Sequence, residues 1–182
     1  TNAFHQAATV ELRAYDGNGQ LLDGLETLEV ASHTESALLL EDLFDTASAA
    51  WVEIRSTQPE LTSVVLQGNF GMDFLAATEL SLALSSRLIF PEILNQGDEE
   101  TWLYLINPNP EEIDVRLGWT QSDGSSVEST AKLGGKEIFV STFRHIFGEG
   151  TGGFVRATVD SGQAIVGVEI SGSSSARAGL AA

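Results

Sequence analysis

The sequence predicts an all-β protein made of two tandem antiparallel β-sandwich modules of the immunoglobulin-like type, with a short helical turn in each module. Three observations lead to this prediction: short stretches in which apolar and polar residues alternate, turn sequences at regular intervals between them, and a repeat of the pattern after about 105 residues. Alternation is the period of a half-buried strand, and no long stretch has helical periodicity. Short strands separated by frequent turns are typical of an antiparallel sandwich.

The repeat is carried by apolar residues and glycines. At an offset of 105 residues, without a gap, the matched pairs are Asn2 with Asn107, Val10 with Val115, Leu12 with Leu117, Gly19 with Gly124, Leu28 with Leu133 and Ser36 with Ser141. A two-residue slip then aligns Leu43-Phe44 with Ile146-Phe147 and Trp51-Val52 with Phe154-Val155, and the 105-residue offset returns for Leu75-Ala76-Ala77 and Leu180-Ala181-Ala182. Core and turn positions recur, whereas no reactive side chain does, so the repeated feature is an architecture. The predicted modules are residues 1–77, which lack their opening strands, and residues 78–182.

Each module is expected to contain a hairpin. Val10, Leu12 and Ala14 share one face of a strand, as do Val115, Leu117 and Trp119 in the second module. The turn sequences Asp16-Gly17-Asn18-Gly19 and Ser122-Asp123-Gly124 follow directly, and they predict hairpin turns because Gly and Asn accept positive φ. The returning strands are predicted over residues 25–30 and 127–133.

The remaining elements follow in matching order. Extended segments are predicted at 36–40 and 136–140, short helical turns at 41–44 and 142–147, and strands at 50–56 and 154–159. Pro59 and Gly162 mark the turns into two further strands, at 61–67 and 164–171. We expect Phe44 and Phe147 to be buried alike, and the truncation of Phe147 to alanine to cost about 3 to 5 kcal/mol in consequence.

Residues 69–106 connect the modules and have no counterpart before residue 1. They contain two predicted strands, at 87–90 and 101–106, joined by a turn at 95–98. If these strands open the second module, the first module has an unpaired strand edge, and an open edge invites pairing with another chain. We therefore expect part of residues 69–106 to pack against the first module, or a homodimer to form through the open edge.

Composition excludes several classes of function. The chain has 9 Lys and Arg against 26 Asp and Glu, a net charge of −17, which repels nucleic acids and anionic membranes. The absence of cysteine excludes a disulfide framework and thiol catalysis. No run of 18 apolar residues is present, so membrane insertion is not expected. There is no initiator Met or signal peptide, so we expect a mature form or an excised fragment.

Candidate reactive groups are few and isolated. His5, His33 and His145 have no neighbours in a metal-like arrangement, and the Asp16 turn lacks the later ligands of a calcium loop. The carboxylate pairs Glu99-Glu100 and Glu111-Glu112 fit solvated loops better than a glycosidase cleft, because neighbours on a strand point to opposite faces. We predict no catalytic residue, no metal ligand and no cofactor.

Aromatic residues provide the one candidate binding site. Trp102 and Tyr104 lie on one face of a predicted strand, and Trp119 ends a neighbouring strand. If exposed, these rings would form a platform on which sugar rings stack. Core packing is the favoured interpretation for Trp119, because it shares a face with Val115 and Leu117.

The second module resembles a known kind of repeat. Its characteristic segments are Leu88-Ile89-Phe90-Pro91, Trp102-Leu103-Tyr104-Leu105-Ile106-Asn107-Pro108, Asp123-Gly124, Phe143 to Phe147, Phe154-Val155-Arg156-Ala157 and Ile165-Val166-Gly167-Val168-Glu169. This order is similar to that of the uncharacterised tandem β-sandwich repeats of about 100 residues found in secreted or surface-anchored bacterial proteins. The resemblance covers residues 87–182 and, as a partial copy, 1–77. It implies an extracellular location and a non-catalytic role, and it supplies no catalytic or ligand residues.

We therefore expect a non-enzymatic extracellular module that acts as a spacer, adhesion or assembly domain of a larger secreted or cell-surface bacterial protein. Its partners would be other domains of that protein or a surface partner. The alternative is a carbohydrate-binding module that uses Trp102, Tyr104 and Trp119, with a polysaccharide as its ligand; an enzyme is a distant third.

Overall fold

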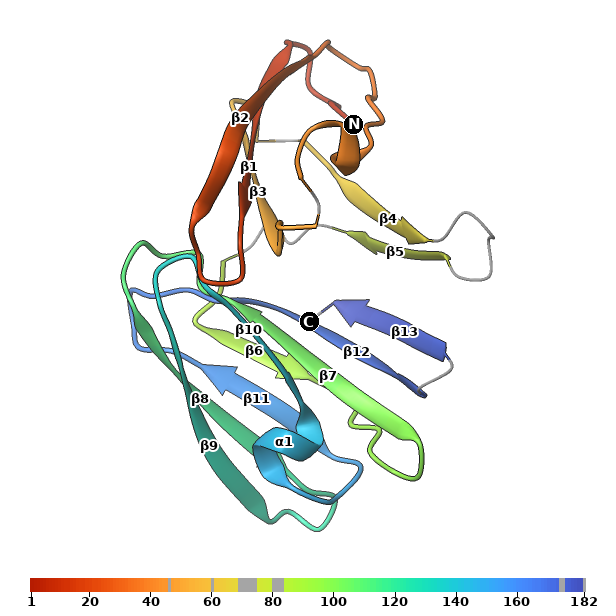
Figure 1. Cartoon of the computed structure of the whole chain (residues 1–182), viewed down its shortest axis with the longest axis vertical. Helices are drawn as coiled ribbons and strands as arrows, with labels where there is room; N and C mark the ends of the chain where they lie inside the picture. Colours follow the sequence, from red (N-terminus) through yellow and green to blue (C-terminus); the bar gives the residue numbers. More distant parts are fainter. Residues whose placement is uncertain (46, 60, 69–74, 80–83, 174–175, 182) are drawn as a thin grey trace.

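The computed structural model describes residues 1–45, 47–59, 61–68, 75–79, 84–173 and 176–181. Over this part of the chain the structure consists of antiparallel strands and two short helical turns (Figure 1). The predicted all-β class is confirmed. We call residues 1–79 the N-terminal region and residues 84–181 the C-terminal region.

The N-terminal region contains a three-stranded sheet and a separate hairpin. The sheet has the order β2-β1-β3 and is formed by β1 (Ala8–Tyr15), β2 (Leu21–Val30) and β3 (Trp51–Ser56). A 3-10 turn, η1 (Leu40–Asp42), lies between β2 and β3. The hairpin pairs β4 (Val64–Gly68) with β5 (Leu75–Glu79).

The C-terminal region is a sandwich of two four-stranded sheets. The first sheet has the order β10-β7-β12-β13, with β7 (Glu99–Ile106), β10 (Ile138–Thr142), β12 (Val166–Ser173) and β13 (Ala176–Ala181). The second sheet has the order β6-β11-β8-β9, with β6 (Arg87–Phe90), β8 (Ile113–Thr120), β9 (Ser126–Leu133) and β11 (Phe154–Thr158). A short helix, α1 (Phe143–Phe147), follows β10.

The predicted elements occur in the predicted order with one exception, and two strands, β5 and β13, were not predicted. The sequence predicts an extended segment at residues 36–40, like the segment that forms β10, but residues 36–39 pair with no strand among those described and Leu40 begins η1. The reason lies in the partner: β10 pairs with β7, and no strand of the described N-terminal region takes the place of β7. Of the connecting residues 69–106, β5 pairs with β4 in the N-terminal region, whereas β6 and β7 build the C-terminal sandwich.

A buried asparagine precedes β1 and β8, the first strands of the two matching hairpins, and makes the same bonds in both places. The side chain of Asn2 donates to the carbonyls of Gln6, Val30 and Ala31 and accepts from the backbone N–H of Phe4. The side chain of Asn107 makes the same four bonds, to the carbonyls of Glu111, Leu133 and Gly134 and from the N–H of Asn109. Both asparagines are fully buried. Each amide thus joins the segment before the first strand to the end of the second strand.

The register of the first hairpin corrects the gapless alignment. Val10 faces Leu28, whereas Val115 faces Ala131, so Leu28 corresponds to Ala131 and not to Leu133. The cause is a bulge in β2, where the register shifts by two residues between Arg13 and Tyr15. The two-residue slip therefore occurs inside β2, ahead of the place where the sequence alignment puts it. Leu28 is half-buried, whereas Ala131 is buried.

Burial differs between the two regions. In the C-terminal region, 15 buried apolar residues, among them Leu103, Leu105 and Phe143, form one continuous core. In the N-terminal region the buried residues form two smaller clusters, one around Val10 and Val30 and the other around Leu12 and Phe44. Phe44 is buried, whereas its match Phe147 is half-buried at the edge of the C-terminal core, because Phe143 occupies the centre.

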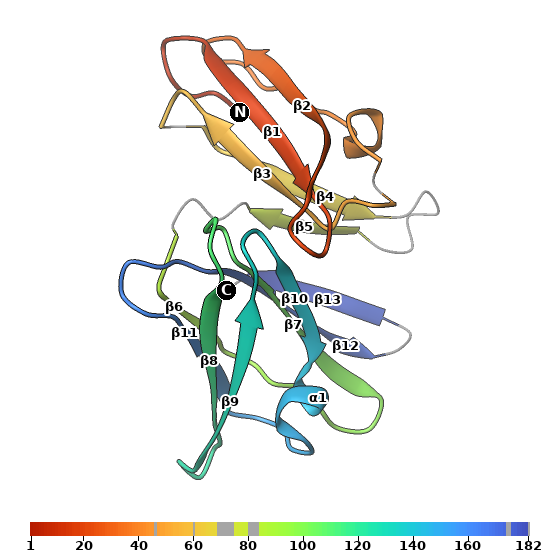
Figure 2. The same ribbon diagram turned by 60° about the vertical axis from the view of Figure 1, so that its left-hand side comes forward.

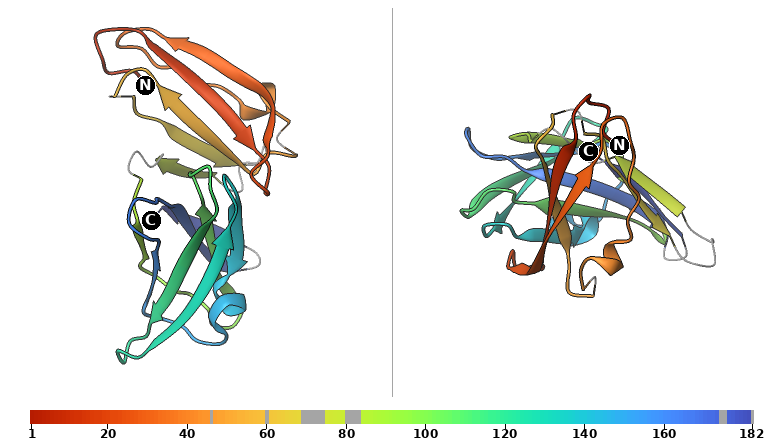
Figure 3. Two further views of the ribbon diagram at one scale, coloured as in Figure 1. Left: turned by 90° about the vertical axis from the view of Figure 1, so that its left-hand side faces the viewer. Right: turned by 90° about the horizontal axis from the view of Figure 1, so that it is seen from above.

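The two regions are stacked end to end. Figure 1 shows the turn between β1 and β2 pointing toward the C-terminal region, and the β4–β5 hairpin between the three-stranded sheet and β13. The same stacking is visible after rotation (Figure 2), and the view along the long axis superimposes the two regions (Figure 3). The turn between β1 and β2 of the N-terminal region therefore contacts the C-terminal region.

Candidate functional site

The structure separates the three aromatic residues of the predicted sugar platform. Trp102 and Tyr104 are half-buried on the outer face of β7, opposite the core residues Leu103 and Leu105. Trp119 is 3% exposed inside the sandwich. It donates from Nε1 to the carbonyl of Gly152 at 2.9 Å and meets the ring of Phe143 edge to face. The structure therefore brings Trp102 and Tyr104 together and places Trp119 in the core.

The predicted turn aspartates serve their own turns. Oδ1 of Asp16 accepts from the backbone N–H groups of Asn18 and Gln20, and Oδ1 of Asp123 accepts from the N–H and the hydroxyl of Ser125. These bonds from Ser125 lower the pKa of Asp123. Both carboxylates thus act as turn caps.

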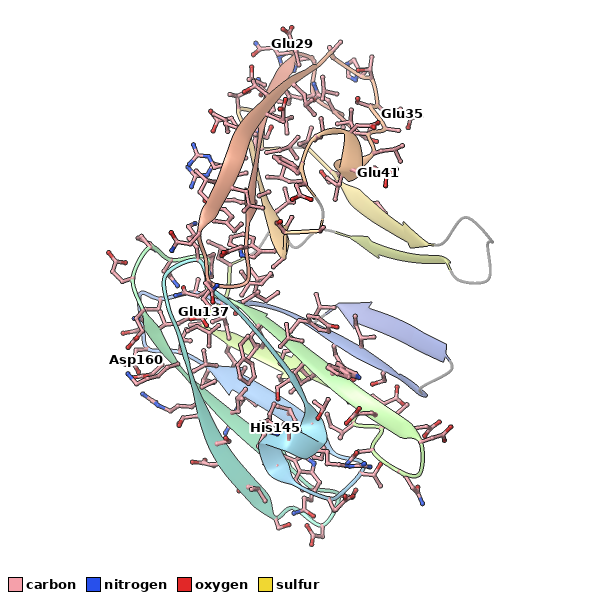
Figure 4. All side chains as sticks on the ribbon, in the orientation of Figure 1. Glu29, Glu35, Glu41, Glu137, His145 and Asp160 are labelled. Atoms are coloured by element: carbon pink, nitrogen blue, oxygen red, sulfur yellow. The ribbon has the colours of Figure 1, made fainter. Side chains whose placement is uncertain are left out.

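Other candidate groups are dispersed over the surface. His5, His33 and His145 are not fully buried, and His145 lies on the solvent side of α1 (Figure 4). Among the described residues, no group of three or more His, Asp or Glu side chains is arranged to hold a metal ion. Glu112 forms an exposed ion pair with Lys132. Neither of the helices in the described part of the chain is long and apolar enough to cross a membrane.

The contact between the two regions combines two stacked aromatic rings with a lysine and a carboxylate. Tyr15 at the end of β1 and Trp51 at the start of β3 stack with ring centroids 4.5 Å apart and an interplanar angle of 14°. Nζ of Lys136, from the turn between β9 and β10, lies 5.7 Å from the centroid of Tyr15 and 5.9 Å from that of Trp51. A cation over stacked rings is attracted by their negative faces. We call this set, together with Glu53, the junction.

Hydrogen bonds fix the lysine in the junction from both ends. Its Nζ donates to the carbonyl of Pro108 at 2.6 Å and lies 3.2 Å from Oε1 of Glu53. Nε1 of Trp51 donates to the carbonyl of Lys136 at 2.9 Å. Lys136 itself has a φ of 62°, a left-handed conformation that is uncommon for a lysine. Its side chain and its carbonyl therefore both serve the contact between the regions.

The backbones of the two regions also meet closely. The N–H of Ile138 donates to the carbonyl of Gly17, in the turn between β1 and β2. Gly19 has a φ of 81°, and a Cβ at this position would collide with the backbone of Gly135 and Lys136. Glycine is therefore needed at residue 19 for two reasons, its backbone conformation and the proximity of the neighbouring turn.

Electrostatics at the junction favour the charged form of Glu53. Burial acts to raise the pKa of Glu53, but hydrogen bonds from Arg55 and Lys136 outweigh it and lower the pKa. Burial, together with the Glu53 carboxylate that accepts from its hydroxyl, raises the pKa of Tyr15. The side chains of Lys136 and Glu53 are 18% and 19% exposed, so water and salt screen this pair less than the exposed Arg116–Asp160 pair.

A second polar site lies inside the C-terminal sandwich. Glu169 of β12 is 1% exposed, and none of the described residues donates a hydrogen bond to either of its carboxyl oxygens. Burial raises its pKa to about 7, although the nearby backbone of Glu92 and the hydroxyl of Ser171 act to lower the pKa. Nearby on the same face, the hydroxyls of Ser171 and Thr101 bond each other at 2.9 Å. This carboxyl is a neutral acid over much of the acidic pH range.

The strand pattern around Glu169 explains why the sequence did not reveal it. Val166, Val168 and Ile170 are apolar and alternate with Gly167 and Glu169, so alternation predicts the valines inside. The structure has the reverse, with Gly167 and Glu169 inside. A Cβ at residue 167 would collide with Leu88 and Phe90, so these large side chains require a glycine beneath them.

The antiparallel sheets define an all-β protein of the sandwich class. Its two regions meet end to end at the junction. The chain belongs to a family of unknown function, DUF5719, whose model matches residues 1–136. The match covers the described N-terminal region and the C-terminal strands β6 to β9. No curated protein and no solved structure matches the chain.

Proposed function

We propose that the chain consists of two tandem units of one sandwich architecture and acts as a non-catalytic structural module of a larger secreted or cell-surface protein, in a spacer, adhesion or assembly role. The four matched hydrogen bonds of Asn2 and Asn107 carry the two-unit proposal. Buried side-chain networks of the same form in two places support descent from one unit, because local propensity does not dictate them.

The junction supports a spacer or assembly role. A linker between independent domains leaves them free to reorient, whereas stacked rings, a lysine with two partners and a backbone hydrogen bond hold the two regions in one orientation. A rigid connection suits a protein that sets the distance between other domains.

Solution scattering tests this role. We expect the wild-type scattering profile to fit a single rigid arrangement with the dimensions of the structure. The variant Trp51→Ala removes a stacked ring and the hydrogen bond to Lys136, and it should increase the maximum dimension and the flexibility of the particle. The control is Arg116→Ala, at an exposed residue of β8 that takes no part in the junction. A wild-type profile that requires an ensemble of orientations would contradict the spacer role.

Carbohydrate binding is the second candidate function, and one observation favours it. Trp102 and Tyr104 lie two residues apart on the outer face of one strand, where two rings can meet neighbouring sugars. Affinity electrophoresis in gels with embedded bacterial or plant polysaccharides tests this function. Retardation that is lost in Trp102→Ala and kept in His145→Ala would support it, and equal mobility in every gel would exclude these polysaccharides as ligands.

A further inference from the structure

The turn between β1 and β2 contains the only Asn-Gly step of the chain, Asn18-Gly19. The other five asparagines precede Ala3, Phe70, Gln96, Pro108 and Pro110. An Asn-Gly step is chemically weak, because no side chain shields the backbone nitrogen of the glycine, which can reach the side-chain carbonyl carbon of the asparagine. Larger residues hinder this approach and proline has no backbone N–H, so Asn18 is the asparagine with the most reactive neighbour.

The turn presents the side chain of Asn18 to solvent. Asn18 is exposed, and none of the described residues forms a hydrogen bond with its side chain. Its backbone is fixed, since its N–H donates to Oδ1 of Asp16 at 2.9 Å. The side-chain carbonyl carbon is therefore open to attack, and the backbone nitrogen of Gly19 decides whether a reaction takes place.

The nitrogen of Gly19 is held in place by the docked turn. Its N–H donates to the carbonyl of Asp16 at 3.1 Å. Gly19 lies so close to the turn between β9 and β10 that a Cβ would collide with the backbone of Gly135 and Lys136. To reach the side chain of Asn18, the nitrogen must rotate out of its bond with Asp16, and this contact prevents the rotation. The closed junction therefore protects the Asn-Gly step, and an open junction exposes it.

We propose that Asn18 is a deamidation site gated by the junction: it reacts when the turn between β1 and β2 leaves the C-terminal region, and its isoaspartate product prevents the turn from docking again. Water is the only other reactant. The nitrogen of Gly19 loses its proton to water and bonds Cγ of Asn18, the Cγ–Nδ2 bond breaks, and ammonia leaves with a proton taken from water. Water then opens the resulting succinimide, at Cγ to give aspartate or at the backbone carbonyl carbon to give isoaspartate.

The isoaspartate product differs from asparagine in backbone and in charge. Its main chain runs through Cγ, so the turn is one carbon atom longer, and a carboxylate is added to a chain with a net charge of −17. The docked turn has no room for this longer path, because Gly19 already touches Lys136 and the carbonyl of Gly17 accepts from the N–H of Ile138. A transient opening of the junction is thereby made permanent.

Ageing of the full chain tests the site. The protein is incubated at mildly alkaline pH, and peptide mapping by mass spectrometry measures the converted fraction of each asparagine. We expect Asn18 to convert at least about tenfold faster than Asn2 or Asn95, whose following residues carry side chains. Aged protein should have a larger maximum dimension in solution scattering than fresh protein. Fresh Asn18→Asp, which carries the new charge without the longer backbone, should not.

Variants of the junction test the gate. Trp51→Ala, which loses one of the two stacked rings, should speed conversion of Asn18 at least about threefold, and Arg116→Ala should leave the rate unchanged. Trp51→Phe keeps a ring, should give a smaller increase, and decides the question if Trp51→Ala unfolds the chain. Asn95 reports such unfolding, because its side chain is buried and donates to the carbonyl of Gly150.

Each other outcome overturns the proposal. Conversion of Asn18 no faster than that of Asn95 would remove the site. Equal rates in wild type and in the folded Trp51 variants would show that the turn reacts while docked, and unchanged scattering after full conversion would show that the product still docks. The proposal rests on the contacts of the junction and not on the spacer role. A fresh wild-type profile that requires an ensemble would end the spacer role and leave the preference for Asn18 unchanged.

Discussion

The N-terminal and C-terminal regions share a buried asparagine with the same four hydrogen bonds, but three strands of the C-terminal region, β6, β7 and β10, have no counterpart among the described strands of the N-terminal region. Where β7 is present, two complete sheets enclose one core of 15 buried apolar residues. Where the described part of the chain has no such strand, between residues 35–40 and β4, the buried residues form two clusters and a row of leucines is exposed. The comparison teaches that two four-stranded sheets enclose one continuous core, whereas a three-stranded sheet with a separate hairpin buries two smaller clusters.

The largest effect should come from Phe143, and it should contrast with the effect at Leu40, which occupies the corresponding position in the N-terminal region. Phe143→Ala removes a fully buried ring that packs against Trp119, and it should lower the free energy of unfolding by about 3 to 5 kcal/mol. Leu40→Ala, at the corresponding exposed position, should cost less than about 1 kcal/mol. Chemical denaturation measures both values. Equal costs would mean that the N-terminal region is as closely packed as the C-terminal one.

The asparagines should show a smaller contrast. Asn107→Ala leaves the carbonyls of Glu111, Leu133 and Gly134 without their donor, and we expect a loss of about 3 kcal/mol. Asn2→Ala removes the same bonds in the region with the smaller core clusters, where the surroundings can relax around the change, and the loss should be about 1 kcal/mol. Denaturant midpoints of the two variants test the order. A loss for Asn2→Ala that equals or exceeds the loss for Asn107→Ala would mean that the smaller clusters are packed as firmly as the C-terminal core.

Glu169 gives the C-terminal region a pH dependence. Its pKa rises from 4.5 to about 7 on folding, so the folded state holds the proton more tightly. Stability from this group is full below about pH 4.5, falls as the pH rises, and is lost above about 7, a total of about 3 kcal/mol. Glu169→Gln cannot ionise and should be more stable than the wild type by about 2 kcal/mol at pH 8, with little difference at pH 5. Unfolding curves at pH 5 and pH 8 test this prediction. If the two proteins differ in stability by the same amount at both pH values, ionisation of Glu169 is not the cause.

The smallest effect is expected from a substitution that makes the N-terminal region more like the C-terminal region. Trp51 corresponds to Phe154, and Trp51→Phe keeps a ring over Lys136 but removes the hydrogen bond to its carbonyl. We expect a loss of about 1 kcal/mol, measured by thermal unfolding. Tyr15→Phe, which removes the weaker bond to Glu53, should cost less. A loss of more than about 3 kcal/mol for Trp51→Phe would mean that the ring exchange disturbs the stacking itself.

Much of the fold is predictable because it is local. Val10 and Val115 alternate with polar neighbours, and the Asp16 and Asp123 turns have their own side-chain caps, so strands and hairpins follow from short stretches of sequence. The bulge that displaces Leu28 is not predictable, since a register depends on both strands. The same holds for Trp119, whose burial depends on the opposite sheet.

The candidate sites are less predictable because they join distant residues. Trp51 and Lys136 are 85 residues apart in sequence, and nothing near either of them signals their contact. Glu169 and Gly167 share the inward face of β12, where Leu88 and Phe90 leave no room for a side chain at residue 167, and alternation on β12 cannot reveal this.

The junction also governs how such molecules meet one another. It is a head-to-tail contact between unlike surfaces, and contacts of this type generate open filaments whenever both surfaces stay available at the ends of the assembly. Here each end departs from the junction sequence. The outer end of the C-terminal region has Thr120, Phe154 and Arg156 where the junction has Tyr15, Trp51 and Glu53, and the outer end of the N-terminal region has His33, with a φ of 53°, in the place of Lys136. The residues of the junction contact are therefore not repeated at these two surfaces, so we expect no head-to-tail association of the protein through a second copy of the junction.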